Sequence, residues 1–327
     1  MGALKKILPV IGLALFAYLL VRIGIKDILS IIAKANFFYI ILTILFIIPI
    51  VFFQAAKWNA ILKKQKIRLK FGDVVKVQLI SIFYGTVTPA RVGSFIKIAY
   101  LQEKIKNFGK ATSSVVIDRA FDMLTVLIFA GIGTLILINQ FPRMVIFIFS
   151  VLAASLIFLM LIISKKNGQR IMRFFYERLL PQNIKKKTRD GFNEFYSSIP
   201  KKRHLIVPFI LNIITWMAIY TQVFFVAKAI NMQISYFIII FMVPIATIIA
   251  EIPISVGGLG LREASLIGLL GVFSVPAKTV MSMSIISLIL GNLIPAILGL
   301  ILAARGYNLK DIQKINKNAK IHNLKKG

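Results

Sequence analysis

Long apolar runs alternate with short, basic, polar segments along this chain of 327 residues. Several runs approach or exceed the roughly 18 to 20 apolar residues that a helix needs to cross a bilayer. The runs that predict crossings are residues 7–23, 37–56, 111–138, 144–164, 205–230, 236–251 and 277–304. A shorter helix over residues 263–273 is expected to climb outward before the last of them. The pattern therefore predicts an all-α, polytopic transmembrane protein with about eight crossings.

Residues 71–94 do not fit a simple crossing. The segment is moderately apolar but contains Asp73, Lys76, Pro89 and Arg91, and basic stretches lie on both sides of it. Basic loops favour the cytoplasmic side of a membrane, so a full crossing would place four lysines on the wrong side. The segment is therefore expected to leave and re-enter on one side, as a re-entrant hairpin or an interfacial helix.

Composition and charge agree with a membrane location. The chain is 58% hydrophobic, and its formal net charge is +30. In a soluble protein this charge would suggest nucleic acid, but here the basic residues lie mostly in short loops and predict topology and anionic-lipid contacts. Both termini are expected to be cytoplasmic, and the protein is expected to lie in the cell (cytoplasmic) membrane. Residues 1–305 are expected to form a single transmembrane domain, followed by a basic cytoplasmic tail over 306–327.

Two kinds of chemistry are disfavoured by the residue types. The absence of cysteine excludes a disulfide framework and thiolate chemistry. The two histidines, His204 and His322, lie far apart in basic surroundings, so a histidine metal or general-base site is not expected. No cofactor, metal or catalytic residue is predicted.

Charged residues also occur within the apolar runs, where an ionised group normally faces a polar cavity or a partner. Asp118 and Asp122 are four residues apart and share one helix face, while Arg119 and Asp122 are three apart and can pair. The like-charged aspartates need more than one cation nearby. In a second place, Pro89 and Gly93 interrupt the backbone around Arg91.

The stretch from Glu251 to Leu266 interrupts a third apolar region. Its proline and three glycines are expected to end one helix, and a new helix is predicted near Leu261. The first N–H groups of that helix would favour an anion, and Arg262 would strengthen the site. Glu263 has two interpretations, a substrate-facing carboxylate or a cap of the same helix. The P-x-x-x-G spacing occurs in both broken segments and hints at an inverted repeat with the site at its interface.

These segments resemble one known membrane family. The stretches TPARVGSFIKIAYL, SSVVIDRAFDML and PISVGGLGLREASLIGLLGVF, in this order and spacing, are similar to the flippase-like family that includes the membrane half of lysylphosphatidylglycerol synthases and the flippase-like part of an archaeal dolichol-linked glycosylation protein. Two positions depart from its pattern: Ser94 replaces a frequent acid, and Lys97 replaces the usual arginine. The resemblance implies lipid translocation between leaflets or a supporting role in lipid-linked glycan pathways. Aminoacyl transfer is not expected, because the separate catalytic domain is missing from this chain.

The hypothesis from the sequence is a flippase-like protein that moves or binds anionic phospholipids or polyprenyl-phosphate-linked headgroups. The predicted substrate-binding residues are Arg91, Gly93, Asp118, Arg119, Asp122, Glu251, Gly257, Gly258, Gly260, Arg262 and Glu263. Two alternatives stay open, an intramembrane enzyme acting on lipid-linked sugars and a non-transporting scaffold. The expected partners are anionic lipids or lipid-linked phosphates and the membrane, not nucleic acid, with a homo-oligomer or a glycosyltransferase partner also open.

Overall fold

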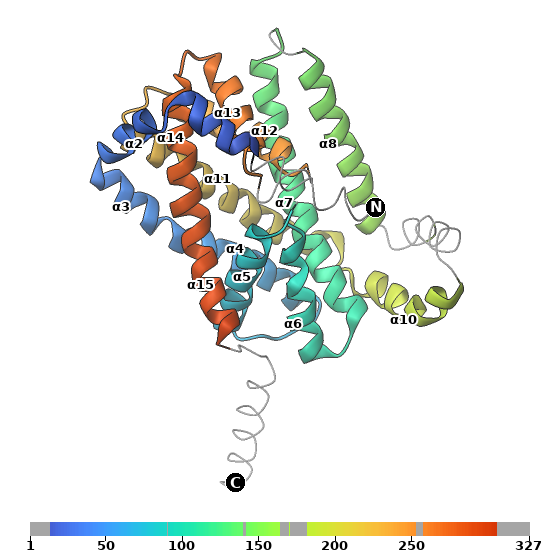
Figure 1. Cartoon of the computed structure of the whole chain (residues 1–327). Helices are drawn as coiled ribbons and strands as arrows, with labels where there is room; N and C mark the ends of the chain where they lie inside the picture. The colour runs from blue at the N-terminus through green and yellow to red at the C-terminus, as the bar shows by residue number, and fades with distance from the viewer. Residues whose placement is uncertain are drawn as a thin grey trace.

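The computed structural model describes residues 14–89, 91–139, 142–163, 170, 182–252 and 258–305, and the regular elements within these ranges are all helices (Figure 1). A helix over Ala14–Ile23 precedes the labelled elements. The helices that follow are α2 (Ile25–Ala33), α3 (Phe37–Leu45), α4 (Ile47–Lys64), α5 (Phe71–Thr86), η1 (Val92–Phe95), α6 (Ile96–Ile105), α7 (Phe108–Ile136), α8 (Pro142–Ile163), α10 (Gln182–Ser198), η2 (Lys202–His204), α11 (Ile206–Ala229), α12 (Tyr236–Ala250), α13 (Leu261–Gly271), α14 (Ala277–Ser287), η3 (Leu288–Leu293) and α15 (Ile294–Ala304). The predicted all-α polytopic fold is confirmed. Residues 7–13 of the first predicted span and the tail 306–327 lie outside the described residues.

Three helical stretches in the described part of the chain are long and apolar enough to cross a membrane. They are Phe37–Lys64, Lys202–Ala229 and Ala277–Ala304. The first is divided at Phe46, between α3 and α4, because Pro49 has no N–H to donate one turn back along the helix. The last contains the π-helical turn η3, which widens the helix locally.

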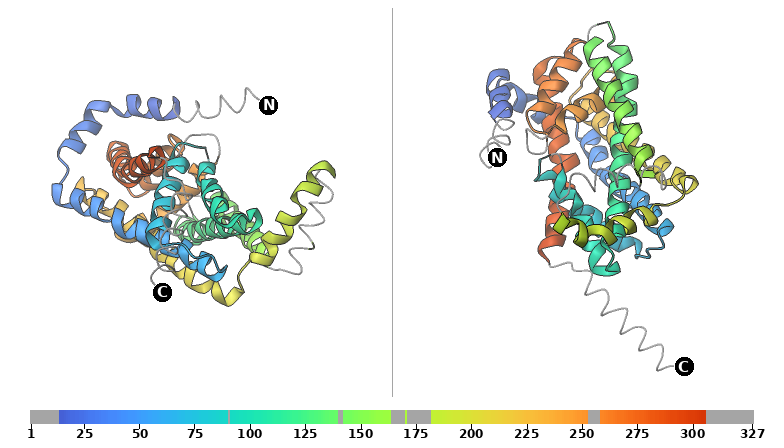
Figure 2. Two further views of the ribbon diagram at one scale, coloured as in Figure 1. Left: turned by 90° about the horizontal axis from the view of Figure 1, so that it is seen from below. Right: turned by 90° about the vertical axis from the view of Figure 1, so that its right-hand side faces the viewer.

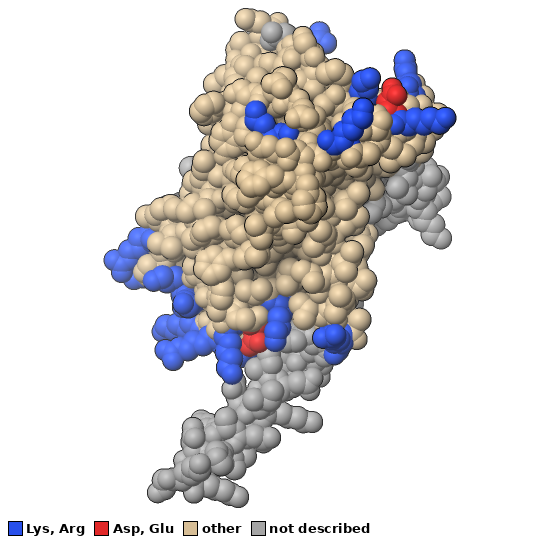
Figure 3. All heavy atoms as spheres, turned by 90° about the vertical axis from the view of Figure 1, so that its left-hand side faces the viewer, with Lys and Arg blue, Asp and Glu red and all other residues tan. Residues whose placement is uncertain are grey.

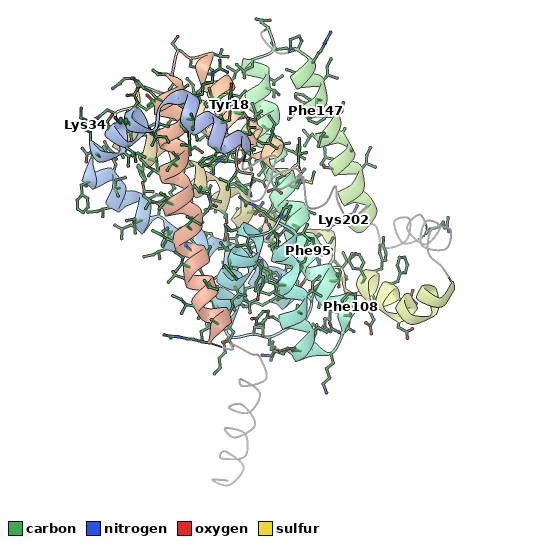
Figure 4. The ribbon with its side chains drawn as sticks, viewed as in Figure 1. Tyr18, Lys34, Phe95, Phe108, Phe147 and Lys202 are labelled. Atoms are coloured by element: carbon green, nitrogen blue, oxygen red, sulfur yellow. The ribbon has the colours of Figure 1, made fainter. Side chains whose placement is uncertain are left out.

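The outer surface of the bundle is apolar between its two charged ends. Figure 3 shows a broad band without charged side chains on one face, with Lys and Arg side chains above and below it. Phe147 lies in the upper half of the bundle and Phe108 near its lower end, and both side chains are exposed (Figure 4). Such an extensive apolar surface is unusual for a protein surrounded by water and fits contact with lipid chains.

α7 is the central helix of the bundle. It packs against α4, α8, α10, α11 and α12. Its backbone approaches α12 closely at Gly133, where an added Cβ atom would lie 2.3 Å from the backbone oxygen of Phe241. α10 lies across the lower end of α7 and extends away from the bundle (Figures 1 and 2). α7 therefore holds its charged residues within the protein rather than against lipid.

Residues 71–94 turn back on themselves. α5 ends at Thr86, and η1 and α6 fold back against it. Gly93 makes this close return possible, because a Cβ atom there would lie 2.2 Å from the backbone oxygen of Tyr84. Arg91, at the turn, has a φ of 53°, which few residues other than glycine adopt. Of the two predicted alternatives, this geometry favours the helical hairpin.

A second interrupted pair is formed by α12 and α13. α12 contains Pro244 and ends at Ala250, and α13 begins at Leu261, where the sequence predicts a new helix. The two helices pack against each other. Figure 1 places the α12–α13 pair in the upper half of the molecule and the α5–α6 pair in the lower half. The two interrupted segments thus belong to opposite halves of the bundle.

Candidate functional site

A polar cavity of about 160 Å³ lies between the interrupted segments. Its walls come from α3, α4, α5, α7, α11, α12, α14 and α15, together with η3 and the residues around both helix breaks. The charged residues of its lining are Lys57, Arg91, Lys97, Asp118, Arg119, Asp122, Glu251 and Arg262. The structure thus brings charges from each of the three sequence motifs into one chamber.

Lys57 of α4 is the centre of a buried ionic cluster. Its Nζ lies 2.8 Å from Asp118 Oδ1 and 2.7 Å from Asp122 Oδ1, and the lysine side chain is only 3% exposed. It also donates a hydrogen bond of 3.0 Å to Asn212 Oδ1 of α11. A further hydrogen bond of 3.4 Å goes to the backbone oxygen of Asp118, so the three donors of the ammonium are used by Asp122, Asn212 and this oxygen.

Asp118 receives a second lysine from the first hairpin. Lys97 of α6 donates to Asp118 Oδ2 at 2.9 Å, and its Nζ lies 4.7 Å from the centre of the Trp58 ring. Lys97 and Asp118 are both buried. The lysine that departs from the pattern of the resembling family therefore compensates a buried carboxylate in the lining of the cavity.

Two polar side chains complete the cluster. Asn212 donates through Nδ2 to the backbone oxygen of Phe121 and to Thr125 Oγ1, each at 2.8 Å, which fixes the orientation of its amide. Arg119 Nη1 lies 3.5 Å from Asp122 Oδ2, the pairing that the sequence predicts. The two aspartates on the shared face of α7 are thus compensated by Lys57, Lys97 and Arg119.

An ion pair joins the two interrupted segments. Arg91 Nε lies 3.5 Å from Glu251 Oε1, and both side chains are almost half exposed, at 42% and 45%. Arg91 stands at the turn between α5 and α6, and Glu251 directly follows α12. The pair therefore connects the turn after α5 with the end of α12, and the two helix breaks meet at the cavity.

The two charged residues at the start of α13, Arg262 and Glu263, have different roles. Arg262 lines the cavity, whereas Glu263 is buried and accepts a hydrogen bond from the Gly260 N–H at 2.6 Å and another from Ser284 Oγ at 2.7 Å. Glu263 is therefore a helix cap, as in one of its two predicted interpretations. Gly258 and Gly260 adopt positive φ angles of 80° and 83°, and Gly258 also lines the cavity.

Gly93 and Ser94 stabilise the turn between α5 and α6 and are not part of the cavity lining. The Gly93 N–H donates to Thr88 Oγ1 at 2.7 Å, and its backbone packs on α5 without lining the cavity. Ser94 is buried and donates to the backbone oxygen of Arg91 at 2.7 Å, so the position that departs from the family pattern stabilises the turn. Gly257 lies outside the described residues.

Several cavity residues were not predicted from the sequence. Lys57 stands at the start of a basic stretch, KWNAILKKQK, which the sequence predicts to be cytoplasmic. Asn212 is a single polar residue within a long apolar run, and Gln78 and Gln54, joined by a hydrogen bond of 3.0 Å, are similar. An isolated amide at membrane depth was the signal available for these three residues.

The sequence matches a known family of membrane proteins over most of its length. Residues 9–299 match the family described as the lysylphosphatidylglycerol synthase TM region. Among similar proteins is the UPF0104 membrane protein PH1989 of Pyrococcus horikoshii, which is 24% identical over 93% of this chain and 98% of its own length. The UPF0104 membrane protein MJ1595 of Methanocaldococcus jannaschii is 23% identical over 88% of this chain and 90% of its own length. A UPF0104 membrane protein of Methanothermobacter thermautotrophicus is 23% identical over 86% and 87%, respectively. The chain is therefore a membrane protein that belongs to the family of the lysylphosphatidylglycerol synthase transmembrane region.

Proposed function

We propose that the protein binds the anionic headgroup of a lipid in the central cavity and moves that lipid between the leaflets of the cytoplasmic membrane. The lipid would be a phospholipid or a polyprenyl-phosphate-linked molecule. Family membership supports a membrane protein, and the charged lining of the cavity supports the choice of an anionic headgroup.

The main observation that supports this proposal is the excess of positive charge in the cavity lining. The described lining holds five cationic side chains and three carboxylates, a formal excess of two positive charges. Uncompensated charge at membrane depth is costly, at about 3 kcal/mol per residue even on permissive insertion scales. An anionic ligand that enters the cavity would supply the missing negative charge. The excess therefore favours anion binding over a purely structural network, which would be closer to neutral.

The interrupted helices give this ligand a route. Irregular backbone is tolerated at membrane depth where it lines a cavity, and discontinuous helices surround the substrate in many transporters. Here Arg91 and Glu251, at the two breaks, are both partly exposed and form part of the cavity wall. A headgroup that reaches this pair would proceed toward Arg119 and Arg262.

The intramembrane enzyme is less favoured by the contacts. Lys57 forms ion pairs with both Asp118 and Asp122, and Asp118 also pairs with Lys97. Carboxylates that are committed to lysines in this way compensate charge and are poorly placed to remove a proton from a substrate.

The proposal is tested in proteoliposomes that contain a fluorescent phosphatidylglycerol. Bleaching of the outer leaflet by dithionite measures how fast the lipid moves between leaflets. Wild-type protein is expected to accelerate this movement, Arg262→Gln to remove most of the acceleration, and the control Arg203→Gln, an exposed arginine outside the cavity, to preserve it. A wild-type rate no higher than that of protein-free vesicles, with phosphatidylglycerol and with a labelled polyprenyl phosphate alike, would refute lipid transport.

A further inference from the structure

The cations of the cavity fall into two groups with different surroundings. Lys57 and Lys97 form short ion pairs of 2.7 to 2.9 Å with Asp118 and Asp122. This group contains two positive and two negative charges and is neutral as a whole. Its members are held by contacts within the protein, so it contributes little net attraction to a ligand.

The second group consists of three arginines and one carboxylate. Arg91 and Arg119 each make a single long ion contact of 3.5 Å, to Glu251 and to Asp122. Arg119 Nε is buried and has no hydrogen-bond partner among the described residues. Arg262 forms no ion pair within the described part of the chain. Since each guanidinium carries five N–H donors, most donors of this group form no hydrogen bond with a described residue.

Neutral donors stand on the wall of the same cavity. Tyr220 Oη, Trp216 Nε1 and Ser287 Oγ are buried, and no described residue or atom forms a hydrogen bond with them. An indole N–H can only donate, and a buried donor without a partner costs about 1 to 3 kcal/mol. The wall thus offers donors that a ligand rich in oxygen acceptors would satisfy.

We infer that the headgroup bound in this cavity is a phosphate monoester in its dianionic form, at the end of a lipid chain. This inference rests on the proposed function and narrows its substrate class. The lysine–aspartate group is neutral as a whole, so Arg91, Arg119 and Arg262 together with Glu251 account for the formal excess of two positive charges in the lining. A monoester dianion matches that charge and presents three terminal oxygens to three guanidinium groups. A phosphodiester such as phosphatidylglycerol carries one charge and leaves one positive charge uncompensated.

The apolar part of the lining argues for a lipid rather than a soluble phosphate. On α4 the residues Ile47, Ile50 and Val51 line the cavity, and on α11 Val223 and Val226 do so. These side chains offer a surface for the first segments of a hydrocarbon chain, which a free phosphate or glycerol phosphate lacks.

The test compares two fluorescent lipids with the same acyl chains, phosphatidic acid and phosphatidylglycerol, in separate proteoliposomes at neutral to slightly alkaline pH. Wild-type protein is expected to move phosphatidic acid roughly tenfold faster than phosphatidylglycerol after subtraction of protein-free controls, a preference equivalent to about 1.4 kcal/mol. Equal rates, or faster phosphatidylglycerol, would overturn the inference and leave lipid transport intact. Movement of neither of these lipids nor of a labelled polyprenyl phosphate would instead refute lipid transport. Uptake of labelled glycerol 1-phosphate faster than that of phosphatidic acid would overturn the assignment to a lipid.

Acidity and substitution give two further readouts of the same preference. The second pKa of a phosphate monoester is about 6, so the preference is expected to fall toward unity when the pH is lowered below that value, while the phosphatidylglycerol rate stays constant. Arg119→Gln is expected to reduce the ratio of the phosphatidic acid rate to the phosphatidylglycerol rate several-fold. Arg119→Lys should retain part of this ratio, and the exposed control Arg203→Gln should leave it unchanged. A ratio that is independent of both pH and Arg119 would contradict the inference.

Discussion

Replacing Lys57 by methionine tests the ionic cluster most directly, because this one ammonium holds two carboxylates. Its Nζ lies 2.8 Å from Asp118 Oδ1 and 2.7 Å from Asp122 Oδ1. Removing one partner of a buried ion pair typically costs about 3 to 5 kcal/mol, because the remaining charge stays buried without compensation. Asp118 keeps Lys97 at 2.9 Å, and Asp122 is 21% exposed. We therefore expect the free energy of unfolding to fall by about 3 kcal/mol, the lower end of that range.

The measurement is an unfolding titration in mixed micelles, followed by tryptophan fluorescence, since Trp58 lies in the same buried region. Lys63→Met is the matched control, because Lys63 is exposed on the same helix, and it should change the stability by no more than about 0.5 kcal/mol. The double variant Lys57→Met, Asp122→Asn removes one charge of each sign and should be more stable than Lys57→Met alone. If Lys57→Met is as stable as Lys63→Met, the cluster does not stabilise the fold as argued.

Three further predictions use the same unfolding measurement. Gly133→Ala should lose about 1 to 3 kcal/mol, because its new methyl would meet the Phe241 carbonyl at 2.3 Å, while Gly268→Ala, where no atom lies within 4 Å, should not be destabilised. Asn212→Leu should lose about 1 to 3 kcal/mol, since Lys57 and two acceptors on α7 lose a partner; wild-type stability would show that these contacts are replaceable. Glu263→Ala should lose about 1 kcal/mol as a lost helix cap, while Glu263→Gln should retain most of the stability; equal losses would assign the residue a purely ionic role.

The helices were predictable where hydrophobic periodicity and breakers agree. The predicted spans 37–56, 205–230 and 277–304 lie in helices, and α13 begins at Leu261 where glycines end the preceding segment. For residues 71–94 the sequence does not distinguish a re-entrant hairpin from an interfacial helix, since an apolar segment with internal charges has the same pattern in both. In the structure, the turn at Arg91 and the close approach of Gly93 to the backbone of Tyr84 favour the hairpin.

The partners of the charged residues were predictable only within one helix. The Arg119–Asp122 contact follows from a spacing of three residues, and the need for several cations near Asp118 follows from like charge. Lys57 and Lys97 could not be assigned to this role, because they come from two other helices at separations of 61 and 21 residues from Asp118. A lysine at the edge of a basic stretch has the same sequence signal whether it faces water or turns inward.

The weak contact between Arg91 and Glu251 indicates where the cavity can open. Both side chains are nearly half exposed and 3.5 Å apart, and exposed pairs of this kind contribute about 0 to 1 kcal/mol. Thermal fluctuations at room temperature are sufficient to part such a pair often, whereas the Lys57 contacts persist. The two halves of the bundle are thus connected weakly by the Arg91–Glu251 pair and strongly by the contacts of Lys57 with Asp118 and Asp122. Any opening of the cavity should begin with separation of Arg91 from Glu251 and leave the Lys57 contacts intact.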